Sequence, residues 1–167
     1  LERAVSQGPV LYLDFDDSET LPRTWIERVL KAHGHDFDND DLPVYYWLPE
    51  EAVEREAGLL NPQVFGDIIS CLDDIKADTG RFPELVVIDT FEPAFPDVDS
   101  NSKNVICAFN KMRKLIKYTA GVSTILLLDH THKPKKDAKD VSVSGSQQKG
   151  ARVRSLHTLL PTRSVEV

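Results

Sequence analysis

Cysteines and long apolar runs are scarce in this sequence, and each scarcity excludes a class of protein. The 167 residues include two cysteines, Cys71 and Cys107, which lie far apart and form no CxxC pair. Because the two cysteines are so far apart and neither has a CxxC partner, we expect no zinc site and no disulfide framework, and a reducing cytoplasm is the expected location. No apolar run approaches the roughly 18 residues that a membrane-spanning helix needs, so we expect no membrane partner.

The start of the chain also lacks familiar features. Residues 1–4 read Leu-Glu-Arg-Ala, with no initiating Met and no apolar signal segment. A length of 167 residues fits one domain, and a hydrophobic fraction of 41% is enough to build a core. We therefore expect residues 1–167 to form a single domain core that is truncated at its N-terminus.

Positive charge is in the minority but is unevenly spread. The formal net charge is −7, which argues against a surface coated with basic residues for nucleic acid. Four lysines nevertheless fall within residues 133–139. This lysine-rich stretch has the polar composition of a surface loop, and a local basic rim remains compatible with an acidic whole.

Apolar runs alternate with segments of helical periodicity along most of the chain. The runs are short and apolar throughout, which is typical of strands in a parallel sheet that is covered on both faces. The pattern therefore predicts an α/β fold with a mostly parallel sheet and helices on both faces. The predicted strands cover residues 10–15, 42–48, 85–89, 123–129 and 155–160, and the predicted helices cover 21–33, 61–78 and 102–120.

Ionisable residues follow three of the predicted strands. The strand at 10–15 runs into Asp14, Asp16 and Asp17. The strand at 85–89 ends at Asp89, and the strand at 123–129 ends in the sequence DHTH at 129–132. Because ligands of parallel α/β sheets bind at the carboxyl ends of the strands, we expect these groups to converge on one sheet edge. Such an edge is suited to a metal ion or a phosphate.

Four segments, in order, resemble the RecA-like P-loop ATPases, especially the RepA-type hexameric helicases and their KaiC- and DnaB-like relatives. VLYLDFDDSE at 10–19 is similar to the strand after the P-loop helix, and LVVIDTFEPAF at 85–95 is similar to the Walker B strand. STILLLDHTHKP at 123–134 is similar to the sensor strand, and GSQQKGARVR at 145–154 is similar to the Gly-Ser segment with basic residues.

This resemblance implies roles for the residues at two strand ends. Asp16 falls where the family has the glutamate that activates the attacking water, and Asp17 is the adjacent candidate. Asp89 would be the Walker B acid that holds Mg²⁺, a cation that prefers hard oxygen ligands. Thr90, the next residue, is a candidate for contact with the nucleotide, so ATP and Mg²⁺ are the implied cofactors.

The same resemblance implies roles nearer the C-terminus and partners for the whole chain. His130 would sense the γ-phosphate, Lys149 would contact nucleotide, and Arg154 or Arg152 would be the arginine finger that reaches a neighbouring subunit's ATP. The implied partners are further copies of the chain, in a ring or filament, and DNA, through the basic loop at 133–139. The implied function is that of a motor domain in DNA replication or recombination.

Two departures from the family pattern stand out. Asp16 is one methylene shorter than glutamate, which could misplace the attacking water. No G-x-x-x-x-G-K-[ST] occurs anywhere in the sequence. Backbone N–H groups of that loop supply most of the phosphate affinity of P-loop proteins. The absence of the motif indicates truncation, with a degenerate, inactive homologue as the alternative. In the family's strand order the P-loop strand would lie between the strands at 123–129 and 155–160, so its loss should leave a gap, make those strands close up, or make the sheet borrow a strand from another chain. We expect the 167-residue chain alone to bind ATP weakly and be inactive.

Two other functions fit parts of the pattern. A two-metal phosphoesterase or nuclease could use the acids at the strand ends, but it leaves the segment at 145–154 unexplained. A non-catalytic oligomerisation module derived from an ATPase is the other alternative. The residues of the metal alternative are Asp14, Asp16, Asp89, Asp129 and His130.

Overall fold

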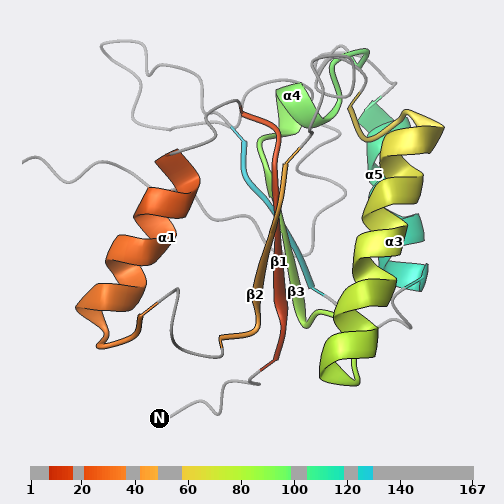
Figure 1. Cartoon of the computed structure of the whole chain (residues 1–167). Helices are drawn as coiled ribbons and strands as arrows, with labels where there is room; N and C mark the ends of the chain where they lie inside the picture. The colour runs from red at the N-terminus through yellow and green to blue at the C-terminus, as the bar shows by residue number, and fades with distance from the viewer. Residues whose placement is uncertain are drawn as a thin grey trace, which may run out of the picture.

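The chain forms a parallel β-sheet with helices on both sides of it (Figure 1). The structure is a computed structural model that describes residues 8–16, 21–36, 42–48, 58–98, 105–118 and 124–129. Its four strands lie in the order β2-β1-β3-β4, and every neighbouring pair is parallel. In chain order the elements are β1 (Val10–Asp14), α1 (Leu21–Ala32), β2 (Val44–Trp47), α3 (Pro62–Thr79), β3 (Leu85–Asp89), α4 (Phe91–Ala94), α5 (Val105–Tyr118) and β4 (Thr124–Leu127).

The predicted α/β class is confirmed, and so are the four strands that fall in the described residues. The predicted strand at 155–160 and the basic loop at 133–139 lie outside the described residues. One element was missed, since α4 occupies a segment for which we predicted neither a helix nor a strand. A helix of four residues is too short to show a helical period, and Pro93 inside it favours a loop by composition.

The ends of α3 follow from local sequence. The side chain of Asn61 caps the helix by accepting a hydrogen bond from the backbone N–H of Gln63 at 2.8 Å, and Pro62 occupies the first helical turn. Gly80 ends the helix in the left-handed conformation at φ 78°, and its N–H donates to the carbonyl of Lys76. These signals fix where α3 begins and ends beside the sheet.

One face of the sheet packs on α3 and α5 and forms the core. Leu11 and Leu13 of β1 are fully buried there, and Val86 and Ile88 of β3 lie beside them. Helix α3 contributes a stripe with helical spacing and α5 contributes a second one. The buried residues of the two helices are Val64, Ile68, Leu72, Ile75, Val105, Ala108, Phe109 and Met112.

The opposite face of the sheet looks toward α1 (Figure 1). Side chains alternate between faces along a strand, so Tyr12 and Asp14 of β1 lie on this face while Leu11 and Leu13 lie on the other. None of the α1 side chains that the structure describes belongs to the buried core, and Trp25 is 60% exposed. No helix within the described residues is both long and apolar enough to cross a membrane.

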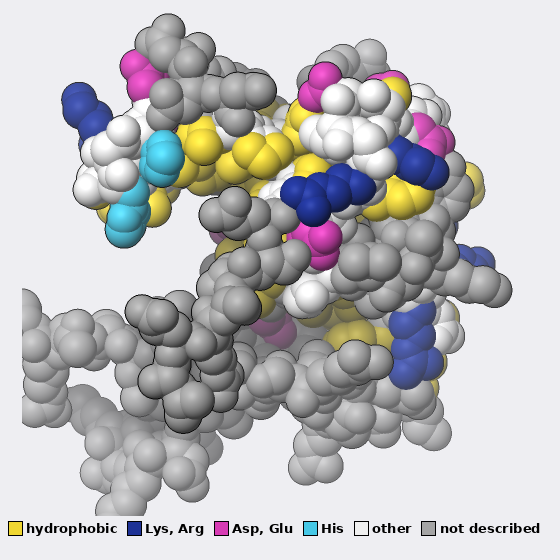
Figure 2. Space-filling view, turned by 90° about the horizontal axis from the view of Figure 1, so that it is seen from below, with side chains coloured by type: hydrophobic (Ala, Val, Ile, Leu, Met, Phe, Trp, Pro, Cys, Tyr) yellow, Lys and Arg dark blue, Asp and Glu magenta, His cyan; other side chains and the backbone are white. Residues whose placement is uncertain are grey.

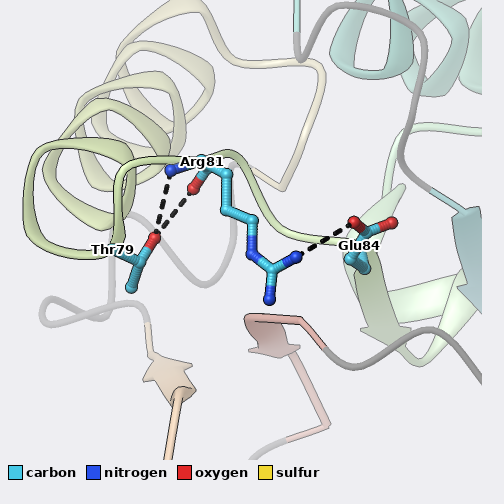
Figure 3. Close-up of polar contacts among 3 residues, drawn as sticks. All are labelled: Thr79, Arg81 and Glu84. Carbon is cyan, nitrogen blue, oxygen red and sulfur yellow. Dashed lines mark hydrogen bonds and ion pairs between the residues drawn. The ribbon is translucent and has the colours of Figure 1, made fainter.

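The amino ends of the strands are held in register by the turn between α3 and β3. The backbone N–H of Glu84 donates to the carbonyl of Pro9, and the carbonyl of Glu84 accepts from the N–H of Thr124 at 2.9 Å. Figure 3 shows the turn itself, where Thr79 Oγ1 bonds the backbone of Arg81 and the Arg81 side chain lies 3.8 Å from that of Glu84. This alignment sets which residues meet at the other ends of the strands.

Figure 2 views the molecule from these amino ends. Basic and acidic side chains of the described residues are interspersed there, and neither sign gathers into one patch. The carboxyl ends, on the far side of that view, carry the candidate site.

Candidate functional site

The carboxyl ends of β1, β3 and β4 meet at one edge of the sheet, as the sequence predicted. Asp14 and Asp89 are register partners on neighbouring strands. Backbone bonds continue just past the strands, because Phe15 N–H donates to the carbonyl of Asp89 at 2.6 Å and Phe91 N–H donates to that of Leu128 at 3.0 Å. The three strand ends are therefore fixed relative to one another.

Asp14 is the buried carboxylate of this edge, with 1% of its surface exposed. One oxygen, Oδ1, accepts the backbone N–H of Asp16 at 3.0 Å. The other, Oδ2, accepts the hydroxyl of Tyr46 from the adjacent strand β2. A buried carboxylate needs such donors, because leaving it without them would carry a large desolvation penalty. Asp14 thereby holds the turn on which Asp16 sits, exposed to solvent.

Asp89 is partly buried and accepts a hydrogen bond on Oδ2 from the hydroxyl of Tyr12. The rings of Tyr12 and Tyr46 stack, with centroids 5.7 Å apart and planes at 20°. We call these two residues the tyrosine pair. Burial, and next the hydrogen bond to its aspartate, raises the pKa of each tyrosine well above the ordinary 10.0. Both hydroxyls are therefore protonated donors at neutral pH.

Thr90 carries a buried polar atom that lacks a partner. Its side chain is 6% exposed, and Oγ1 has no hydrogen bond within the described structure. The residue follows Asp89 directly across a cis peptide bond. A buried hydroxyl usually has a partner, and a hydroxyl beside a carboxylate is the hard-oxygen donor set that Mg²⁺ takes. The residues at the end of β3 therefore fit the cation that the resemblance implies.

The structure brings together part of the predicted site. Asp14, Asp16, Asp89 and Thr90 lie at the carboxyl edge, and Asp129 follows the end of β4. Among the described residues no group of three or more His, Cys, Asp or Glu side chains could hold a metal ion, and His130 of the two-metal alternative lies outside those residues. The remaining predicted site residues, Asp17, His130, Lys149, Arg152 and Arg154, lie outside the described residues.

Sequence reasoning missed the tyrosine pair. Tyr12 shares a face with Asp14 by the two-residue period of a strand, so the sequence held a signal for it. Tyr46 had no such signal, because its contact with Asp14 depends on β2 pairing with β1 in one particular register. We had interpreted residues 45–47 only as a strand.

Comparison with known protein families matches residues 1–136 of the chain to the AAA domain. A search of the curated proteins finds no match. The family match covers the strand ends with Asp16 and Asp89, and it indicates a P-loop ATPase-type domain, of a kind that generally uses ATP and Mg²⁺. Since it spans well over half of the 167 residues, the chain belongs to the AAA domain family.

Proposed function

We propose that the chain is the ATP-hydrolysing motor domain of a RecA-like DNA helicase, replication or recombination protein. In this proposal the domain assembles into a ring or filament, with ATP held between neighbouring subunits. The observation that carries it is the pairing of β1 with β3, which sets the Asp14–Asp16 turn next to Asp89 at the carboxyl edge. The order of motifs along the sequence supports the finer assignment to the RecA-like group.

Each acid has a distinct task in this proposal. Asp89, with Thr90 beside it, would hold Mg²⁺, which when bound neutralises charge on the phosphates. Asp16 is the exposed carboxylate of the neighbouring turn and would orient the attacking water. Asp14 has both oxygens engaged by hydrogen bonds and would support the turn rather than react.

The first test replaces Asp89 in the full-length protein. Asp89→Asn keeps the size of the side chain and removes its charge, so we expect turnover of Mg-ATP to fall about 10²-fold or more. The matched control is Asp78→Asn, since Asp78 is an exposed carboxylate on α3 that also accepts a tyrosine hydroxyl, that of Tyr45. Equal turnover in the two variants would refute the assignment of Asp89.

The assembly is tested by mixing two inactive variants. Arg154→Ala should abolish hydrolysis while largely preserving ATP binding, because an arginine finger acts on the transition state. Mixing this protein with Asp16→Ala protein should restore part of the activity at hybrid interfaces, where one subunit supplies Asp16 and the other Arg154. If both variants assemble and no mixture recovers turnover, the finger assignment is wrong.

The DNA partner is tested through the lysines of the basic loop at 133–139. Replacing all four by glutamine should weaken DNA binding and reduce the slope of log affinity against log salt, since each phosphate contact releases counterions. Turnover of ATP without DNA should be unaffected. An unchanged salt slope would show that DNA, if bound, is bound elsewhere.

A further inference from the structure

The two acids of the carboxyl edge are held from the same side by two stacked rings. Tyr12 is on β1 and donates to Asp89 on β3, while Tyr46 is on β2 and donates to Asp14 on β1. Each hydroxyl therefore reaches across to a carboxylate on a neighbouring strand. The stacked rings make the two contacts a single unit that spans three strands.

We propose that the tyrosine pair is a positioning device for the reaction, in which Tyr12 orients Asp89 toward the cation and Tyr46, through Asp14, orients the turn of Asp16. This inference rests on the proposed ATP hydrolysis and deepens it. Tyr12 lies within the first of the four segments that resemble the family and Tyr46 lies outside all four, but the resemblance implies no role for either tyrosine. Both are positioning residues, because each acts through an aspartate.

The hydrogen bond from Tyr12 determines which oxygen of the Asp89 carboxylate would face a cation. With Oδ2 engaged by the hydroxyl, Oδ1 accepts no hydrogen bond from the described residues, and in this proposal it is the oxygen that would face the cation. Free rotation of the carboxylate would exchange the two oxygens, and the hydroxyl removes that freedom. Residues that hold a metal ligand in this way typically change metal affinity about 10–100-fold when they are replaced.

The contact of Tyr46 acts on a different part of the site. Its hydroxyl binds one oxygen of Asp14, and the other oxygen binds the backbone N–H of Asp16. Losing the hydroxyl leaves Asp14 less well held and loosens the turn that presents Asp16. Misplacing a catalytic group lowers the rate without changing cation affinity.

The two halves of the pair therefore predict different defects. In the full-length protein, Tyr12→Phe should weaken binding of Mn²⁺, measured by electron paramagnetic resonance with a non-hydrolysable ATP analogue, about 10–100-fold. Tyr46→Phe should lower kcat while Mn²⁺ affinity and KM stay close to those of the unmodified protein. Phenylalanine keeps both rings in place, so the stack and the packing are retained.

Tyr45→Phe is the matched control. Tyr45 neighbours Tyr46 on β2, and its hydroxyl also donates to an aspartate, Asp78, at 2.5 Å. Alternation sends it to the other face of the sheet, away from the two acids. This variant should retain both Mn²⁺ affinity and kcat.

The outcomes separate this inference from the proposed function. If Asp89→Asn is inactive but Tyr12→Phe and Tyr46→Phe both behave like Tyr45→Phe, the positioning role is wrong and the ATPase assignment stands. If the unmodified protein does not hydrolyse ATP, the proposed function fails, and Mn²⁺ affinity still tests the contact of Tyr12 with Asp89.

A spectroscopic measurement on the unmodified protein covers the case in which a variant does not fold. Binding of Mn²⁺ should change the near-ultraviolet absorption of the tyrosines, because the cation draws charge from the carboxylate that accepts the hydroxyl of Tyr12. An absorption spectrum that is unaltered at saturating Mn²⁺ would overturn the inference.

Discussion

Replacing Gly58 by alanine tests how the end of α4, which follows β3, is held. Gly58 has φ +58°, and a Cβ built on it would lie 2.4 Å from Pro96 Cδ and 2.7 Å from the carbonyl oxygen of Ala94. That same oxygen accepts the backbone N–H of Leu59 at 2.7 Å. The end of α4 is thus docked on the segment before α3, and a side chain at 58 would push the two apart.

The cost of Gly58→Ala has two parts. An L-residue in the left-handed conformation costs roughly 1–2 kcal/mol relative to glycine. The collision adds an overpacking penalty of about 1–3 kcal/mol, since one of the two nearest atoms belongs to the backbone and cannot rotate away. We therefore expect Gly58→Ala to lower the free energy of unfolding by about 2–5 kcal/mol.

Alanine substitutions at two other glycines distinguish the cost of backbone strain from the cost of the collision. Gly80 has φ +78° and no atom within 4 Å of a built Cβ, so Gly80→Ala should cost only the roughly 1–2 kcal/mol of strain. Gly66 lies inside α3 with open space around it, so Gly66→Ala should stabilise by about 1 kcal/mol. Urea unfolding followed by circular dichroism gives all three values. A cost for Gly58→Ala no larger than that for Gly80→Ala would refute the docking of the end of α4 on the segment before α3.

Four shorter predictions follow from other features. Asn61→Ala removes the cap of α3 and should cost about 1 kcal/mol in the same urea assay. A thiol reagent should label the exposed Cys107 faster than Cys71, whose pKa is raised by burial and by Asp74, and mass spectrometry of the labelled peptides gives the order. The tyrosine pair has pKa values raised above the ordinary 10.0, so its contribution to stability is fully present below that pH and should decline as pH rises above it. Unfolding midpoints of the unmodified protein and of the Tyr12→Phe, Tyr46→Phe double variant should therefore converge in alkali. Calorimetric titration of the 167-residue chain with Mg-ATP should detect no micromolar binding, because the sequence has no P-loop motif, and micromolar binding would show that the site does not depend on one.

Local sequence was sufficient to predict those elements whose bounds depend on residues close to one another in the chain. Asn61, Pro62 and Gly80 set the ends of α3 through a cap, a fixed φ and a left-handed turn, and each effect involves residues a few positions apart. Burial on both faces makes a parallel strand apolar along its length, so β1 and β3 were also recognisable. The helix α4 was not, because four residues are fewer than the period needed to detect it.

The candidate site likewise has parts that depend on local sequence and parts that depend on contacts between distant residues. That Asp16 and Asp89 end apolar strands could be read from the sequence, and parallel strands bring such ends to one edge. The pairing of β1 with β3 could not be predicted from the sequence, because 70 residues of the chain lie between the two strands and their register is held by backbone hydrogen bonds at Glu84. A slip of one residue in that register would send Asp89 to the face where Ile88 now packs.

The same dependence on register explains the changed interpretation of Asp14. In sequence it is one more acid at a strand end, and it entered the two-metal alternative on equal terms with Asp16. In the structure it is buried, with one oxygen bound by Tyr46 and the other by the backbone of Asp16. A carboxylate whose two oxygens are both engaged is better suited to holding a turn than to binding a metal ion. Burial and the pairing of β2 with β1, which no motif reveals, distinguish Asp14 from Asp16 and Asp89, the two acids to which the proposed function gives a part in the reaction.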